Sequence, residues 1–316
     1  MSSTEKGITL VLGSGGARGL AHIGVLACLQ EYGVPVRAVA GTSIGAFVGG
    51  LFASGMRAPD MVEVIASMDT LRVTKILLPG LSSSALISTP SVRKFVAGLA
   101  GSRCIEDLPI PFRAVATDLM TGEGVVLDRG PLVDAILASI AIPGLFQPVV
   151  SEGRYLIDGG LSNPVPVSVA SGLAGGLTVA VDVTPNPSRL RTRIGAHIAK
   201  ADSRKRRGVP AWLAEALKAG RYPRLNRTLR RVPERLKRPK PPKPPYSPTA
   251  VRVSLQAISI SAHNLIQLQL QRTPPDLLID PAVEEFDMLE FHKGAEIIRC
   301  GYDAARAAMP ALLRLL

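Results

Sequence analysis

Cysteine, histidine and aromatic residues are scarce in this sequence of 316 residues, which contains three, four and thirteen of them. The cysteines, Cys28, Cys104 and Cys300, are odd in number and widely scattered, so they form neither a disulfide framework nor a metal-ligand pattern. Such cysteines are typical of reduced thiols in the cytoplasm. The four histidines, the usual catalytic bases, stand at His22, His197, His263 and His292.

Long apolar runs are also missing. No stretch approaches the roughly 20 apolar residues that a membrane-spanning helix needs. The first seven residues, MSSTEKG, lack the apolar core of a signal peptide and run directly into a strand-like segment. We therefore expect a cytoplasmic protein that contacts the inner surface of the membrane at most peripherally.

Acidic residues are nearly absent from one part of the chain. Between residues 186 and 248 there are nineteen Lys and Arg and only three acidic residues, whereas the remainder has 18 basic and 22 acidic residues. The end of this basic arm, RVPERLKRPKPPKPPYSP, has seven prolines in eighteen residues and cannot pack as helix or sheet. We expect one domain, residues 7–305, interrupted by a basic, proline-rich insertion at about 186–250.

The basic arm is a candidate contact surface for a polyanion, because its charges suit anionic lipid or the phosphates of nucleic acid. Its segment PAWLAEALKAG resembles a short amphipathic helix with a basic flank, which favours a membrane interface. No nucleic-acid motif is present. We expect peripheral contact with anionic membrane through residues 186–248. A non-catalytic protein that binds membrane or nucleic acid through this arm is one alternative function.

The first fifty residues alternate between short apolar runs and helical patterns. Residues 7–12, GITLVL, and 36–41, VRAVAG, are runs typical of buried strands. A glycine-rich turn and a helical pattern follow each of them, and the two helical patterns cover residues 20–33 and 44–55. This order of strand, helix, strand and helix indicates a parallel sheet with helices on its faces.

The rest of the chain continues this mixture. The patterns predict strands at 112–119, 122–127, 148–158 (a hairpin turning at residues 152–153), 176–183 and 276–280. They predict helices at 61–68, 91–99, 251–270 and 291–309, and another that starts at residue 132 and is stopped by Pro143-Gly144.

The segment GTSIGAF, residues 41–47, places Ser43 between Gly41 and Gly45 in the pattern Gly-x-Ser-x-Gly. This pattern is typical of a strand that turns sharply into a helix and exposes the serine at the positive end of the helix dipole. The two glycines let the turn tighten and the helix pack closely. A serine becomes a strong nucleophile only when a base takes its proton, so the position of the base decides the chemistry.

A second glycine-rich turn, GSGGARG at residues 13–19, follows the first expected strand. Free N–H groups at Gly15, Gly16 and Ala17 are suited to holding a negatively charged oxygen. A dinucleotide loop is disfavoured, because Arg18 stands where a third glycine is required and no acidic residue follows at the required distance. The phosphate loop GxxxxGK[ST] is absent. Arg18 is expected to order the turn by bonding nearby carbonyl or carboxylate oxygens.

Two carboxylates are candidates for a role beside the serine. Asp158 ends the second strand of the hairpin, and Gly159 and Gly160 after it allow a close approach to another turn; a turn bonded to its own backbone is the alternative. Asp118, in VATDLMTGEG, is expected to bond its own turn. A Ser43–Asp158–His292 triad has the chain order of an α/β-hydrolase, but several strands usually precede the nucleophile in that fold.

The three stretches GSGGARG, GTSIGAF and IDGG, in this order, resemble the patatin-like phospholipase family, and so do ASIAIPGLFQP and LSNPVP. The similarity covers most of residues 7–185 and resumes at 251–305. It implies an α/β fold, a three-layer sandwich with a mostly parallel central sheet and helices on both faces. It also implies hydrolysis of phospholipid or lysophospholipid esters by a Ser43–Asp158 dyad without histidine, an oxyanion hole in the glycine-rich turn, and no metal or organic cofactor.

Two features depart from the family pattern. Ser14 stands where the family's loop often has a glycine, and the basic arm has no counterpart in the family's core. We expect the loop at 78–88 and the helix at 251–272 to line the substrate pocket. The positions expected to support the site are Gly41, Gly45, Arg18, Gly19, Gly159 and Gly160.

Overall fold

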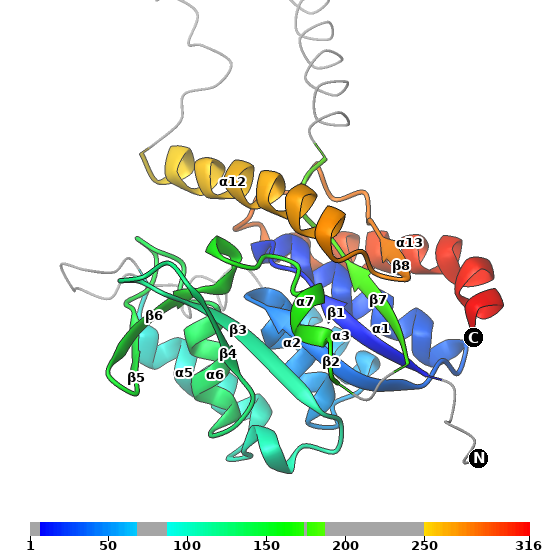
Figure 1. Ribbon diagram of the computed structural model, residues 1–316, viewed down its shortest axis with the longest axis horizontal. Coiled ribbons are helices and arrows are strands. Elements are labelled where there is room, and N and C mark those ends of the chain that lie inside the picture. The colour runs from blue at the N-terminus through cyan, green and yellow to red at the C-terminus, as the bar shows by residue number, and fades with distance from the viewer. Residues whose placement is uncertain (1–6, 68–86, 174–175, 187–249) are drawn as a thin grey trace, which may run out of the picture. The chain divides into compact units, whose positions relative to one another are not determined.

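The computed structural model (Figure 1) describes residues 7–67, 87–173, 176–186 and 250–316. The chain divides into two units, one formed by residues 1–186 and 254–316 and the other by residues 187–253. Nearly all of the basic arm and of the loop at 78–88 lies outside the described residues. The single domain with one insertion therefore stays a prediction.

The core of the first unit is an eight-stranded sheet with the order β5-β6-β3-β2-β1-β7-β8, and β4 pairs with β3. Pairing is parallel from β3 through β2, β1 and β7 to β8, and antiparallel between β3, β4, β5 and β6. The strands are β1 (Ile8–Leu12), β2 (Val36–Thr42), β3 (Phe112–Asp118), β4 (Gly124–Leu127), β5 (Val149–Ser151), β6 (Arg154–Asp158), β7 (Leu177–Val181) and β8 (Leu277–Ile279).

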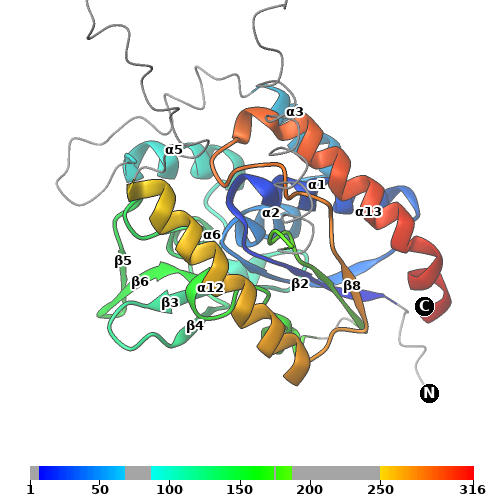
Figure 2. The same ribbon diagram turned by 90° about the horizontal axis from the view of Figure 1, so that it is seen from above.

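The helices form layers on the two faces of this sheet, as Figure 2 shows from above. The α-helices are α1 (Ala21–Glu31), α2 (Ile44–Ala53), α3 (Ala58–Ala66), α5 (Thr89–Ala100), α6 (Leu132–Ser139), α7 (Val167–Ala170), α12 (Ala250–Arg272) and α13 (Gly294–Leu315). Short 3-10 helices are η1 (Gly16–Leu20), η2 (Ile105–Asp107), η3 (Gly159–Leu161) and η4 (Phe291–Lys293).

Alternating side chains of the buried strand β1 pack into two separate hydrophobic cores, one on each face of the sheet. Leu10 and Leu12 pack into the larger core with α1, α2 and α13, whereas Val11 packs with Ile266 of α12 and with residues of α7. This alternation follows from the two-residue period of a strand. The three-layer α/β fold with a mostly parallel sheet is therefore confirmed.

One helix ends earlier than the sequence pattern predicts. We expected the helix that starts at residue 132 to run until Pro143-Gly144 stops it, but α6 ends at Ser139. The backbone then leaves the helix, because the carbonyl of Ala141 accepts a hydrogen bond from the N–H of Asp158 on β6. A proline also disfavours helical conformation in the residue before it, which here is Ile142. Ile140 and Ile142, which follow the end of α6, line the cavity described below.

Candidate active site

Ser43 occupies the sharp turn between β2 and α2, with φ 56° and ψ −123°. A positive φ is strained for a residue with a Cβ, and within the described residues only Ser43 and Glu152 show it without being glycine. The neighbouring Gly45 permits the turn, because a Cβ there would lie 2.1 Å from the carbonyl oxygen of Leu12. The strand-to-helix elbow predicted from GTSIGAF is confirmed.

Strand β3 brings Asp158 to this elbow from a distant part of the chain. It pairs in parallel with β2, where Val115 lies beside Thr42, and antiparallel with β6, where Ala116 lies beside Asp158. The ends of β2 and β6 therefore meet across one strand. The Ser43 Oγ donates a hydrogen bond of 2.5 Å to Oδ2 of Asp158, although the two residues are 115 positions apart.

The Asp158 carboxyl group is buried, with 6% of the residue exposed. Burial raises its pKa from 3.8 to about 6, and the hydrogen bonds from the Ser43 hydroxyl and the Gly160 N–H lower it in part. The Gly160 N–H donates to Oδ1 at 2.7 Å. The carboxylate is thus ionised at neutral pH but is more basic than a solvated aspartate. Such a pKa suits a base that works near pH 7.

The glycine-rich turn lies beside the Ser43 elbow. Gly16 and Gly15 line the two cavities that open at Ser43. Among the described residues, no acceptor is hydrogen-bonded to the N–H of either glycine. The N–H of Ala17 instead donates to the carbonyl of Met288 at 2.8 Å. The expectation of three free donors is therefore wrong for Ala17, because the segment before α13 supplies an acceptor that no local pattern indicates.

Two buried basic side chains hold this turn in place. The Arg18 Nε donates to the carbonyl of Phe286 at 2.7 Å, as expected of a residue that orders the loop. Burial lowers the pKa of Arg18 to about 10. His22 is fully buried, and its Nε2 donates to the carbonyl of Gly13 at 2.8 Å. Burial lowers the pKa of His22 to about 4, so the ring is neutral at neutral pH.

The rival triad is not formed. His292 lies on η4 and is exposed, and in the described part of the chain no histidine is hydrogen-bonded to Ser43 or Asp158. Asp118 bonds its own turn, since its Oδ1 accepts the N–H of Met120 at 2.8 Å, as predicted. The described residues contain no cluster of three or more His, Cys, Asp or Glu side chains placed to hold a metal ion.

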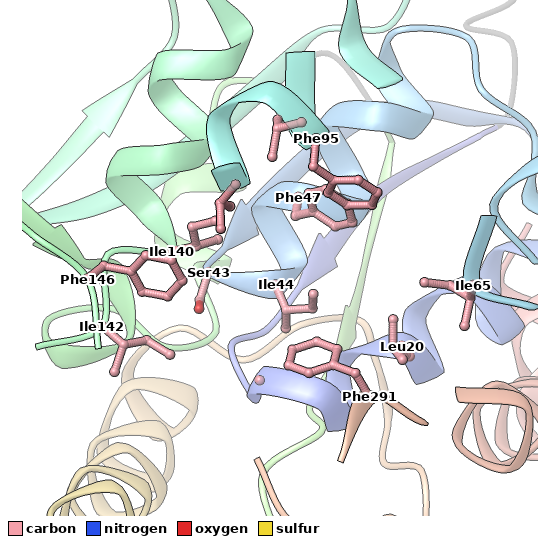
Figure 3. Close-up of a pocket in the computed structure, with 13 residues that line it drawn as sticks. Leu20, Ser43, Ile44, Phe47, Ile65, Phe95, Ile140, Ile142, Phe146 and Phe291 are labelled. Atoms are coloured by element: carbon pink, nitrogen blue, oxygen red, sulfur yellow. The ribbon is translucent and has the colours of Figure 1, made fainter. Parts of the chain in front are cut away.

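Ser43 opens into an apolar cavity of about 120 Å³ (Figure 3). In Figure 3 the Ser43 hydroxyl lies among Ile44, Ile140 and Ile142, and the labelled side chains continue away from it toward Ile65. The remaining lining residues are Gly16, Leu20, Phe47, Val92, Phe95, Val96, Phe146 and Phe291. Because separate elements supply this wall, the sequence contains no signal that groups these residues.

A second, smaller cavity of about 30 Å³ is also lined by Ser43. It also contacts Asp158, and its wall carries the hydroxyl-bearing residues Ser14, Thr184 and Ser259. Ser259 belongs to α12, so the prediction that the helix at 251–272 lines the pocket is confirmed. The site thus joins a larger apolar cavity and a smaller cavity, whose wall includes hydroxyl-bearing side chains, at Ser43.

A family model described as patatin-like phospholipase matches residues 10–171, a span that contains the glycine-rich turn, the elbow and Asp158. An uncharacterized NTE family protein of Mycobacterium tuberculosis is 33% identical over 98% of this chain and 93% of its own length. The chain belongs to the patatin-like phospholipase family. By this membership the protein is a lipid acyl hydrolase.

Two further relatives match a smaller share of the chain. A patatin-like phospholipase domain-containing protein of Caenorhabditis elegans is 39% identical over 57% of this chain, and this match spans 14% of the worm protein. Patatin-like phospholipase domain-containing protein 7 of Rattus norvegicus is 35% identical over the same shares. The crystal structure of VipD from Legionella pneumophila matches 98% of this chain and 67% of its own, with 14% identity and a TM-score of 0.47.

Proposed function

We propose that the protein is a serine hydrolase that cleaves carboxylic ester bonds of phospholipids or lysophospholipids, with Ser43 as nucleophile and Asp158 as base. The observation that carries this proposal is the 2.5 Å hydrogen bond from the Ser43 hydroxyl to the Asp158 carboxylate beside an apolar cavity. A nucleophile in hydrogen-bond contact with a base is the arrangement that covalent catalysis requires.

In the first half of the reaction, Ser43 Oγ attacks the ester carbonyl carbon while Asp158 takes the hydroxyl proton. The negative charge then develops on the carbonyl oxygen, to which the N–H groups of Gly15 and Gly16 can donate, since among the described residues no acceptor is bonded to either. The bond to the alcohol breaks as Asp158 returns the proton to the departing oxygen. In the second half, water attacks the acyl-serine, Asp158 takes its proton, and Ser43 leaves with that proton. The net products are a carboxylic acid and an alcohol.

The two cavities differ in size and in the polar groups on their walls, which suits the two unlike halves of such an ester. The larger cavity is lined by aliphatic and aromatic side chains, so burial there stabilises an acyl chain by about 0.8 kcal/mol for each methylene. The smaller cavity carries hydroxyl groups, which suit the polar alcohol portion. We assign the acyl chain to the first cavity and the alcohol to the second.

Labelling with a fluorophosphonate, which phosphonylates activated serines, tests this function. We expect one adduct per chain in the wild-type protein, located at Ser43 by mass spectrometry and absent from Ser43→Ala. Hydrolysis of a lysophospholipid and a diacyl phospholipid is then measured with the same two proteins. A folded wild-type protein that forms no adduct at Ser43 would contradict the proposal.

We also propose that the protein reaches its substrate by peripheral contact with anionic membrane through residues 186–248. The support is the excess of nineteen Lys and Arg over three acidic residues in this arm. A further support is the apolar surface of α12, the helix that follows the arm, where Ile260 and Leu268 are 53% and 60% exposed. Among the described residues, no helix combines the length and the apolarity that a membrane crossing requires.

Deleting residues 204–246 is expected to abolish binding to anionic vesicles, because each Lys or Arg near such a surface contributes about 1 kcal/mol. Sedimentation with phosphatidylglycerol and with phosphatidylcholine vesicles, at low and high salt, measures the effect. Wild-type binding should be lost on the zwitterionic vesicles and weakened by salt. Equal binding by the deletion variant would show that the arm is not the contact.

A further inference from the structure

Ser139, the last residue of α6, is a fully buried serine with one hydrogen bond to strand β3 and one to the Ser43 elbow. Its Oγ donates to the carbonyl of Val115 on β3 at 2.5 Å, and the same Oγ accepts the N–H of Ser43 at 2.8 Å. The residue is 0% exposed. Ser139 thus ties the backbone of the nucleophile to the strand that also pairs with Asp158.

Ala141, two positions after Ser139, is hydrogen-bonded to the backbone of Asp158, the second residue of the Ser43–Asp158 pair. The carbonyl of Ala141 accepts the N–H of Asp158 at 2.9 Å. The three residues from Ser139 to Ala141 therefore bind the backbone amides of both Ser43 and Asp158. Ser43 lies just after the end of β2 and Asp158 is the last residue of β6, so both bonds are made where a strand ends.

We propose that Ser139 is a positioning residue that sets the geometry of the Ser43–Asp158 pair through the backbone of Ser43. Ser43 keeps φ at 56°, and such strain persists only where surrounding contacts enforce it. The Ser139 hydroxyl provides an enforcing contact at the amide nitrogen next to that torsion. This role rests on the function proposed above. It also gives a structural role to the segment ASIAIPGLFQP, which the sequence alone identified only by its resemblance to the family.

The arrangement also determines which amides remain for the substrate. The Ser43 N–H is taken by the Ser139 hydroxyl, so it is unavailable to a developing oxyanion. Gly15 and Gly16 of the glycine-rich turn keep N–H groups to which no acceptor is hydrogen-bonded in the described part of the chain. A reacting group has to be held within about 0.5 Å of its productive position, and loss of the Ser139 contact lets the elbow relax.

Ser139→Ala is the test variant, and Ser54→Ala is its matched control. Ser54 is also a buried serine at the end of a helix, and its Oγ donates to the carbonyl of Leu51 at 2.7 Å. It does not line either cavity at Ser43. Ser139→Cys is the second variant, since a thiol keeps nearly the same shape but is a weak donor and acceptor.

We expect Ser139→Ala to slow fluorophosphonate labelling and to lower kcat by about 100-fold, the size of effect that a misplacement near 1 Å produces. KM should stay within about twofold, because both cavities keep their walls. Ser139→Cys should fall between this variant and the wild type, and Ser54→Ala should match the wild type. Hydrogen exchange of the peptide 40–47 should show lost protection of the Ser43 amide in Ser139→Ala, a smaller loss in Ser139→Cys and none in Ser54→Ala.

Labelling and kcat of Ser139→Ala or Ser139→Cys at the wild-type level would overturn the inference, as would unchanged exchange at Ser43. Equal losses in Ser54→Ala would also overturn it, since they would reflect general destabilisation. If the wild-type protein formed no adduct at Ser43, that result would contradict the proposed function, and the inference that rests on it would fail as well. The wild-type result therefore tests the proposed function, and the results for the Ser139 variants test the positioning role.

Discussion

Asp158→Asn is expected to slow ester hydrolysis by about 10³-fold, within the range that general-base catalysis contributes, and at the same time to stabilise the fold. The activity falls because an amide cannot take the proton of the Ser43 hydroxyl. The stability rises because burial disfavours the ionised carboxylate, whose pKa is raised to about 6. A shift of about two pKa units corresponds to about 3 kcal/mol of unfolding free energy at neutral pH.

The pH dependence of these two effects has a definite sign. The native state binds the Asp158 proton more tightly than the unfolded state, so the wild type loses stability relative to Asp158→Asn as the pH rises from about 4 to about 6. The deficit is constant above that range. Wild-type kcat/KM falls below about pH 6, where the base becomes protonated. Urea unfolding at pH 4, 6 and 8 and a pH–rate profile measure both.

Asp182→Asn is the matched control for this prediction. Asp182 is buried beyond the end of β7, and burial raises its pKa to about 6 as well. Its Oδ1 accepts the N–H of Thr184 at 2.8 Å, and it contacts neither Ser43 nor Asp158. We expect this variant to gain stability above pH 6 while it keeps its rate of ester hydrolysis. A similar loss of activity in both variants would mean that Asp158 is not a specific base.

Replacement of Ser43 by glycine and by alanine should separate the chemistry of the hydroxyl from the strain of its backbone. Both variants are expected to lose hydrolysis and fluorophosphonate labelling, because both lack the nucleophile. Ser43→Gly should be more stable than Ser43→Ala by about 1 kcal/mol, since strain at such a φ costs about 1–3 kcal/mol and the entropy of the unfolded glycine chain offsets part of it. The φ of Ser43 is 56°.

Ser54 again provides the control pair. Its φ of −76° and ψ of −3° are ordinary for any residue, so Ser54→Ala should be more stable than Ser54→Gly, the reverse order. Urea unfolding of the four variants measures the two differences. If alanine were the more stable substitute at both positions, the elbow would not be strained. The strained elbow is also the feature that the Ser139 hydrogen bond is proposed to hold.

The sequence by itself determined the local parts of this site. GTSIGAF predicted the turn at Ser43, because only glycine at 41 and 45 allows a backbone approach as close as the one seen at Gly45. The apolar runs predicted the buried strands, since a strand with helices on both faces exposes neither side to water. The family resemblance named Asp158, whose carboxylate lies 2.5 Å from the serine hydroxyl.

Tertiary structure decided which local groups remain free. Ala17 belongs to the same turn as Gly15 and Gly16, yet its N–H is taken by Met288, more than 270 residues away in the chain. The end of α6 was misjudged for the same kind of reason, because the acceptor at Ala141 is used by Asp158 from another strand. No local pattern records a partner that arrives from so far along the chain.

The apolar cavity and the Ser139 contact are likewise products of the assembled sheet. β3 pairs with both β2 and β6 and packs against α6, and together these contacts place Val115, Ser139 and Ser43 in one chain of hydrogen bonds. Short-range propensity set each strand and turn, because those depend on neighbours in sequence. Distances between the reacting atoms depend on the register of nonadjacent strands, which only the folded chain establishes.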